Sequence, residues 1–252
     1  MKNYSVLLPT LNEVGHIKLL IDDIKKNFVT KKIDYEILVI DDNSTDGTIE
    51  VVESISKLDP NIKIIVRKSK KRSLVASLNE GIKNANNNYI IWMDADFSHP
   101  PNYINEFIEK NILEDYDAII FSRFLKNSER YYLLQNIKPK VIDKMSFVLN
   151  KICQNVISKN FTDYTSGFIC IKKETISEIN ISGYYGDYFI DLIFELLKRK
   201  KKIRELPYIE KDRASGFSKT TTNKFNLLIK CYFYFIGILK CFFKGFSLFS
   251  LK

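Results

Sequence analysis

The chain has 252 residues, of which 45% are hydrophobic and 27% are charged, a composition that excludes a wholly disordered protein. Its length allows one large domain or one domain with an appendage, and we expect the second. The formal net charge is +9, from 39 Lys plus Arg against 30 Asp plus Glu. This excess indicates an anionic partner, which could be nucleic acid, phospholipid or a phosphorylated substrate.

The four cysteines show no CxxC spacing and the chain has only two histidines, so the pattern does not indicate a zinc site. We expect reduced, mostly buried thiols of a cytoplasmic protein. The first residues lead straight into a strand-like run without an apolar signal region. We therefore expect no export signal.

Short apolar runs of β-rich composition alternate with helical patterns over the first 120 residues. The predicted strands are residues 4–8, 36–40, 62–66, 89–93 and 118–121. Apolar offsets of three and four predict a helix after Asn12, a candidate helix cap, and another over residues 74–85. Such alternation favours right-handed crossovers and a mainly parallel sheet with helices on both faces.

The second half of the chain is less regular. Apolar periodicity predicts long helices over about residues 141–156 and 188–198, and β-rich runs predict strands at residues 168–171 and 203–209. The composition becomes strongly aromatic and apolar near residue 222. We therefore predict a domain over residues 1–222 and a tail over residues 223–252.

Three acidic motifs follow predicted strands: PTLNE at 9–13, DDNSTDGT at 41–48 and DADFSHPP at 94–101. Ligands of open α/β sheets bind outside the carboxyl ends of the strands, so the motifs should line one edge. On an extended chain Asp94 and Asp96 would point the same way and share one hard metal ion, which prefers oxygen ligands. Taken alone, DADFSHPP could equally be a strand that ends in an acidic turn.

With RASGFSK at 213–219, these motifs resemble those of glycosyltransferase family 2, and within it the polyprenyl-phosphate (dolichol-phosphate) mannose synthases, over about residues 3–220. The family has PTYNE, DADLSHPP and D-T-S-G-F where this chain has PTLNE, DADFSHPP and DYTSGF. Its E-x-P strand, Arg and G-x-S-K correspond to Glu205, Arg213 and Lys219. The resemblance implies the α/β GT-A fold of nucleotide-diphospho-sugar transferases, with a mainly parallel, Rossmann-like sheet flanked by helices and an amphipathic helical tail.

The resemblance also implies roles on the donor side. The nucleoside of the sugar donor would be held by Pro9, Leu11, Glu13, Ile40 and Asp42. The donor diphosphate and a metal ion would be held by Asp94, Ala95 and Asp96, with Asp94 and Asp96 as ligands of Mg²⁺ or Mn²⁺, since carboxylates need a cation between themselves and a diphosphate. Further cations for phosphate oxygens would come from Arg123, Arg213 and Lys219.

The acceptor determines which catalytic groups are needed. A polyprenyl phosphate needs no strong base, because the second pKa of a phosphomonoester is about 6. Basic residues on that side would be Lys138, Lys140 and Lys144, although Pro139 departs from the family pattern. A sugar hydroxyl would need a carboxylate base. Asp163 is the candidate for that base, and the alternative is that Asp163 orients its own loop.

Two further positions depart from the family pattern. Residues 70–74 replace a Gly-rich segment, so the glycines that would allow close backbone approach are missing. The family's helix carboxylate could correspond to Asp191 or to Glu195.

The tail is crowded with aromatic and aliphatic residues. Its longest uncharged run, residues 231–239, is far shorter than the ~20 residues of a membrane-spanning helix. Helical geometry places Lys230, Lys240 and Lys244 on one side. A basic stripe beside an aromatic face is typical of an interfacial helix on an anionic leaflet. The alternatives are a helix docked on the catalytic domain and a dimer contact.

The sequence therefore predicts an inverting, metal-dependent transfer of a sugar from a nucleotide donor to a polyprenyl phosphate. We expect it at the cytoplasmic face of the membrane, with peripheral contact through the tail. GDP-mannose is the favoured donor, UDP-sugars remain open, and no nucleic-acid partner is expected. One alternative is a family 2 transferase that acts on a hydroxyl acceptor in polysaccharide or glycolipid assembly. Another is a non-catalytic basic protein that binds membrane or nucleic acid.

Overall fold

The computed structural model describes residues 3–69, 71–109, 116–126, 128, 141–210 and 224–249. The fold is α/β, with a seven-stranded sheet in the order β3-β2-β1-β4-β6-β5-β7. The chain divides into two compact units. The first comprises residues 1–119, 168–180 and 210–216, and the second residues 120–167, 181–209 and 217–252.

The first unit contains most of the parallel sheet. Its strands are β1 (Asn3–Thr10), β2 (Asp34–Asp41), β3 (Ile62–Val66), β4 (Tyr89–Trp92) and β6 (Ile169–Lys172). Its helices are α1 (Ile17–Val29), α2 (Thr48–Leu58), α3 (Leu74–Asn84), η1 (Pro101–Tyr103), α4 (Ile104–Glu109) and α7 (Lys173–Ser177). Strand β1 pairs in parallel with β2 and β4, and β2 with β3, whereas β4 and β6 are antiparallel.

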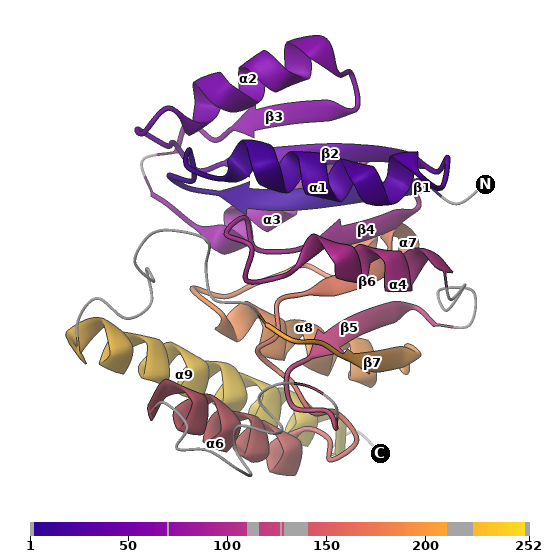
Figure 1. The fold of residues 1–252 in the computed structure, drawn as a ribbon. Coiled ribbons are helices and arrows are strands. Elements are labelled where there is room, and N and C mark those ends of the chain that lie inside the picture. The colour runs from indigo at the N-terminus through magenta and orange to yellow at the C-terminus, as the bar shows by residue number, and fades with distance from the viewer. Residues whose placement is uncertain are drawn as a thin grey trace. The chain divides into compact units, whose positions relative to one another are not determined.

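Helices cover both faces of this part of the sheet (Figure 1). Helix α1 contacts α2, η1 and α4 on one face, and α3 contacts β1, β2 and α7 on the other. Helix α3 approaches the strands closely at Gly81, because a Cβ there would lie 2.8 Å from Ile40 Cδ1 and 3.1 Å from Leu7 Cδ1. Only glycine allows that approach without displacing these side chains.

The predicted helix after PTLNE is confirmed, but its start differs from the prediction. Helix α1 begins at Ile17, with His16 at the cap position. Asn12 instead has a positive φ of 55°, a conformation that asparagine adopts more readily than most residues. Its side-chain oxygen accepts a hydrogen bond from the Thr45 amide at 2.9 Å. Asn12 therefore joins two loops and does not cap the helix.

The second unit contains the end of β5 (Ala118–Ser122), α6 (Val141–Val156), α8 (Asp187–Lys198), β7 (Ile203–Pro207) and α9 (Lys224–Phe249). Helix α9 contacts both α8 and α6 (Figure 1). Helices α9 and α8 come close at Gly237 of α9, since a Cβ there would lie 3.2 Å from Cβ of Asp187 on α8. The Phe233 and Tyr184 rings stack at 4.8 Å.

The predicted basic stripe of the tail does not face outward as a whole. Lys244 donates to Asp191 at 2.5 Å and to Glu195 at 3.2 Å, both on α8. The alternative of a helix docked on its own domain therefore describes this part of α9, because carboxylates on α8 attract the lysine. No helix in the described part of the chain is both long and apolar enough to cross a bilayer.

Candidate functional site

The loops after β1 and β2 are joined to each other by hydrogen bonds. The Asn12 amide donates to Ser44 Oγ at 2.8 Å, and the Glu13 amide donates to Thr48 Oγ1 at 2.9 Å. Strand register places Thr10 beside Asp41, so PTLNE and DDNSTDGT begin at the same edge of the sheet. The predicted convergence of these two motifs is thus present in the first unit.

Asp41 and Asp42, at the end of β2, differ in what they bind. Asp41 is fully buried and accepts hydrogen bonds from the Ser44 amide and hydroxyl at 2.7 and 2.5 Å, so it shapes its own loop. Asp42 binds Arg67 Nη1 at 2.5 Å through one oxygen and the Ser73 amide at 2.6 Å through the other. Asp42, a predicted nucleoside ligand, therefore also anchors the segment between β3 and α3.

The other predicted nucleoside residues lie along the same edge. Pro9, Leu11 and Glu13 are partly exposed. Ile40 is fully buried, and its side chain packs against α3 near Gly81. Pro9, Leu11 and Glu13 therefore have surface that a ligand could contact, whereas the side chain of Ile40 belongs to the core.

DADFSHPP forms a braced turn directly after β4. The strand ends at Trp92, and Ala95 and Asp96 lie in the turn. The Asp94 amide donates to His99 Nδ1 at 2.9 Å, and Asp96 Oδ1 accepts from the Ser98 amide at 3.0 Å. The His99 ring stacks on Phe168, with centroids 4.9 Å apart. The turn is thus closed on itself and held against a buried aromatic ring.

This geometry corrects the argument that paired Asp94 with Asp96 by strand alternation. Because β4 ends before them, the two residues are not on an extended strand, and they differ in burial: Asp94 is exposed, whereas Asp96 is 4% exposed. Ala95 is also buried. If Asp94 and Asp96 share a metal ion, the turn must bring their carboxylates together, and the spacing of the two residues in the sequence does not specify this.

The donor set of the turn suits a hard divalent cation. Ser98 Oγ is buried and has no hydrogen-bond partner among the described residues, which is unusual for a buried hydroxyl. Together with the two carboxylates it provides oxygen donors only, as Mg²⁺ and Mn²⁺ prefer. The described residues contain no cluster of three or more His, Cys, Asp or Glu side chains suited to a metal. Phosphate and water would have to supply the remaining ligands.

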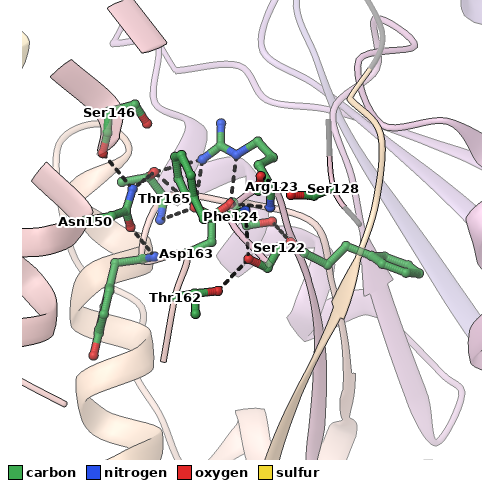
Figure 2. A network of polar contacts seen from close by, with 12 residues as sticks. Ser122, Arg123, Phe124, Ser128, Ser146, Asn150, Thr162, Asp163 and Thr165 are labelled. Atoms are coloured by element: carbon green, nitrogen blue, oxygen red, sulfur yellow. Dashed lines mark hydrogen bonds and ion pairs between the residues drawn. The ribbon is translucent and has the colours of Figure 1, made fainter. Parts of the chain in front are cut away.

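Arg123 lies in a polar network of the second unit (Figure 2). Its Nε and Nη2 donate to Asp163 Oδ2 and Oδ1, both at 2.8 Å, and its amide donates to Oδ2 at 3.0 Å. Nη2 also donates to Thr165 Oγ1 at 2.8 Å. Burial would raise the pKa of Asp163, but the charge and hydrogen bonds of Arg123 outweigh it and lower that pKa. Asp163 thus acts as a fixed partner of Arg123.

The remaining predicted residues fall into two groups. Asp191 and Glu195 both bind Lys244, and Lys144 is exposed on α6. Four predicted cations lie outside the described residues: Lys138, Lys140, Arg213 and Lys219.

Sequence reasoning missed residues that act on the predicted ones. Arg67 and Ser73 bind Asp42, and His99 braces the DADFSHPP turn. Ser98 and His99 are part of the DADFSHPP motif, so the sequence could have indicated that their polar side chains belong to the site. Arg67 stands among several other cations, and its role depends on a contact 25 positions away.

The chain was compared with known proteins. A family model described as glycosyl transferase family 2 matches residues 5–179. Dolichol-phosphate mannosyltransferase of Pyrococcus furiosus is 32% identical over 221 residues, which cover 85% of this chain and 58% of that protein. The Saccharomyces cerevisiae dolichol-phosphate mannosyltransferase is 32% identical over 124 residues, which cover 48% of this chain and 45% of that protein. The aligned part thus spans about half the length of these relatives.

Solved structures share the fold. Glucosyl-3-phosphoglycerate synthase from Mycobacterium tuberculosis, in complex with Mn²⁺, uridine diphosphate and glucosyl-3-phosphoglycerate, superposes with a TM-score of 0.59 at 17% identity. The match covers 86% of this chain and 73% of that one, and at this identity it bears on the fold alone. It supports the predicted GT-A fold. Since the family model spans well over half of the sequence, the chain belongs to glycosyltransferase family 2.

Proposed function

We propose that the protein transfers a sugar, with inversion, from a nucleotide-sugar donor to a polyprenyl phosphate at the cytoplasmic face of a membrane. The main support is the braced DADFSHPP turn beside the joined loops of PTLNE and DDNSTDGT. The relatives named dolichol-phosphate mannosyltransferase support a lipid phosphate acceptor and mannose as the sugar, and hence GDP-mannose as donor. UDP-sugars remain the alternative donors.

In this proposal the donor side is built from the first unit. Pro9, Leu11, Glu13, Asp42 and the backbone near Ile40 would hold the nucleoside. Asp94, Asp96 and the Ser98 hydroxyl would hold Mg²⁺ or Mn²⁺, and Ala95 would lie against the diphosphate. When bound, the metal ion would neutralise charge on the leaving diphosphate. His99 would keep the turn in shape through the Asp94 amide.

Arg123 would supply a fixed positive charge for phosphate oxygens, with Arg213 and Lys219 as further cations. The bidentate contact with Asp163 immobilises the guanidinium before any ligand arrives. A preorganised cation stabilises developing negative charge without the cost of reorganisation during the reaction. Holding Arg123 in this way would favour transfer between two phosphate-bearing substrates.

The second candidate function, transfer to a sugar hydroxyl, requires a carboxylate base. The candidate base Asp163 is fully buried, has a lowered pKa and is bound to Arg123, a poor arrangement for removing a proton from a substrate. A phosphate acceptor needs no such base. These contacts therefore favour the lipid phosphate.

A membrane-side acceptor would also explain the exposed face of α9. Tyr232, Phe235, Phe242 and Phe243 are among the exposed large hydrophobic residues, and Lys240 is exposed nearby along the helix. The spacing of the four aromatic residues places them on the side of α9 opposite the buried Gly237 and Cys241, and Lys240 lies at the edge of that side. Aromatic side chains with a neighbouring cation suit the interface of an anionic leaflet.

The experiment combines membranes containing the protein with labelled GDP-mannose and undecaprenyl or dolichyl phosphate. We expect an acid-labile product that is extracted into chloroform. Asp94→Asn and Asp96→Asn should each reduce its formation about a hundredfold or more while the protein remains folded, as expected when electrostatic stabilisation of the leaving group is lost.

The matched control is Asp34→Asn, which removes an exposed carboxylate at the opposite, amino end of β2 and should leave the rate unchanged. Label found only in polysaccharide would contradict a lipid phosphate acceptor. Full activity of both turn variants would contradict the donor site.

A further inference from the structure

A short turn, residues 162–165, presents Asp163 to Arg123 and is held from two sides within the second unit. From β7, Glu205 accepts hydrogen bonds from the Thr162 and Asp163 amides at 2.8 and 3.0 Å. From α6, Asn150 accepts from the Tyr164 amide at 2.6 Å. The side chains that fix the turn therefore also fix the partner of Arg123.

The Glu205 contacts continue into a chain of hydroxyl groups. Thr162 Oγ1 donates to Glu205 Oε1 at 2.8 Å and lies 2.6 Å from Ser122 Oγ, where either hydroxyl could be the donor. Figure 2 shows the Thr162 to Ser122 contact beside Arg123. With Glu205 ionised, Thr162 donates to it. With Glu205 protonated, the carboxyl could donate to Thr162, which would then donate to Ser122. The two hydroxyl groups can thus reverse the direction of their hydrogen bonds to match either protonation state of Glu205.

The charges of this network are unbalanced when all groups are ionised. Asp163 is bound to Arg123, and Glu205 accepts from the Asp163 amide, so the two carboxylates are close together. Two like charges at short range disfavour the ionisation of one of them. Burial, with the charge of Asp163, raises the pKa of Glu205 to about 7, against the opposing hydrogen bonds from Thr162 and Asp163. Among the described residues, the titratable groups near this network are Arg123, Tyr164, Cys153 on α6, and Tyr234 and Cys241 on α9.

We propose that Glu205 is a positioning residue for Arg123 and that it takes up a proton when an anionic ligand binds beside that guanidinium. The added negative charge disfavours the ionised form of Glu205. One proton then moves from solvent to the carboxylate, an O–H bond forms, and the Thr162 and Ser122 hydroxyls reorient. No other bond changes. The inference rests on the proposed function, which places a phosphate of a substrate near Arg123.

Calorimetric titration of the whole protein with GDP or UDP, in the presence of Mg²⁺, tests the proposal. The binding heat is measured at pH 7 in Mops and in Tris, whose ionisation enthalpies differ, so that the two heats together report proton uptake. At pH 7 Glu205 should be about half protonated, so nucleotide binding should cause the uptake of at most about half a proton per protein molecule. The nucleotide and the metal ion also exchange protons on binding. Their contribution is removed by subtracting the uptake of a variant that lacks the Glu205 carboxylate.

Glu205→Gln is that variant, because its amide can still bind Thr162 but does not titrate. Proton uptake in the wild type should exceed uptake in E205Q. The nucleotide Kd should depend less on pH between about 6 and 8 in E205Q, where only the titration of the nucleotide and of the groups that bind it remains. Equal uptake in both proteins would overturn the proposal. A role for Glu205 in folding alone would not change a proton count.

If E205Q does not fold, the pH dependence of proton uptake in the wild type still tests the proposal. Its excess uptake should be largest near pH 7 to 8 and should vanish near pH 5, where Glu205 is already protonated. Uptake that persists unchanged at pH 5 would contradict the assignment to Glu205. If no nucleotide binds at all, the proposed function fails instead, so the two failures are distinguishable.

Discussion

At the scale of single residues, two of the predicted site residues are joined to opposite charges. Asp42 is bound to Arg67, and Arg123 is bound to Asp163. An ion pair that is buried and hydrogen-bonded holds both groups in one orientation. A ligand that reaches Asp42 or Arg123 therefore meets a group whose position is already set, which favours recognition by shape as well as by charge.

Glu36 is a carboxylate with a structural role at the amino end of the sheet. Its oxygens accept hydrogen bonds from Ser5 Oγ at 2.6 Å, the Asn86 amide at 2.6 Å and Lys63 Nζ at 2.8 Å. Burial would raise the pKa of Glu36, but these hydrogen bonds outweigh it and lower the pKa to about 2. The contacts tie β1, β3 and the loop before β4 to one side chain.

We predict that Glu36→Gln lowers the free energy of unfolding at pH 7 by about 1–3 kcal/mol, because charged hydrogen bonds to buried groups are lost. The folded pKa lies below the unfolded value near 4.5, so the contribution is complete above pH 4.5 and disappears as the pH falls toward 2. Urea unfolding at pH 7, 4 and 3 should show the difference between the two proteins shrinking.

Glu53→Gln, at an exposed position of α2, is the matched control and should have little effect at any of these pH values. A difference between wild type and E36Q that stays constant down to pH 3 would show that Glu36 contributes by packing and not by charge.

At the scale of elements, α9 has two faces with different chemistry. One face packs on α8 through Gly237 and through the ion pairs of Lys244. The other exposes Phe235 and Phe243, at 59% and 65% of their surface. Large exposed aromatic residues in such a row are costly in water unless another surface covers them.

We predict that the double variant Phe235→Ser with Phe243→Ser reduces binding to vesicles of phosphatidylglycerol and phosphatidylethanolamine by about tenfold or more. Two aromatic side chains that enter the interface each contribute on the order of 1 kcal/mol or more. Cosedimentation of the protein with the vesicles measures the effect.

The control is Leu19→Ser with Leu58→Ser, which removes exposed apolar side chains from α1 and α2 of the first unit. It should bind vesicles as the wild type does. Equal binding of the α9 variant and this control would argue that the aromatic face of α9 serves another partner.

At the scale of the whole molecule, donor binding should be visible as a gain in stability. A ligand that binds only the folded state at a hundred times its Kd adds about 2.7 kcal/mol. For a protein of this length that gain corresponds to a rise in Tm of roughly 5–10 °C. With Mn²⁺ present, we predict the largest rise for GDP-mannose, and a smaller one for UDP-glucose and UDP-N-acetylglucosamine.

Asp96→Asn should abolish most of this rise, and so should removal of Mn²⁺ by a chelator, because in the proposed function both changes would weaken the binding of the cation that neutralises the diphosphate. A larger shift with a UDP-sugar than with GDP-mannose would reassign the donor. Shifts that do not depend on the metal would contradict the proposed role of the DADFSHPP turn.

Local sequence determined the family, the alternation of strands and helices, and the placement of PTLNE, DDNSTDGT and DADFSHPP after strands β1, β2 and β4. These features depend on periodicity and on motifs within a few positions, and parallel strands then bring their carboxyl ends to one edge. Helix α2 was not predicted, although Val51, Ile55 and Leu58 recur at the offsets of an amphipathic helix.

Only the tertiary structure decided which partner each charged residue has. Arg67 binds Asp42, Arg123 binds Asp163 and Lys244 binds Asp191, across separations of 25, 40 and 53 positions. In sequence each is one cation among the 39 lysines and arginines, and a Coulomb attraction depends on distance in space and on burial. The sequence thus determined where carboxylates and cations stand along the chain, whereas folding determined which of them neutralise each other.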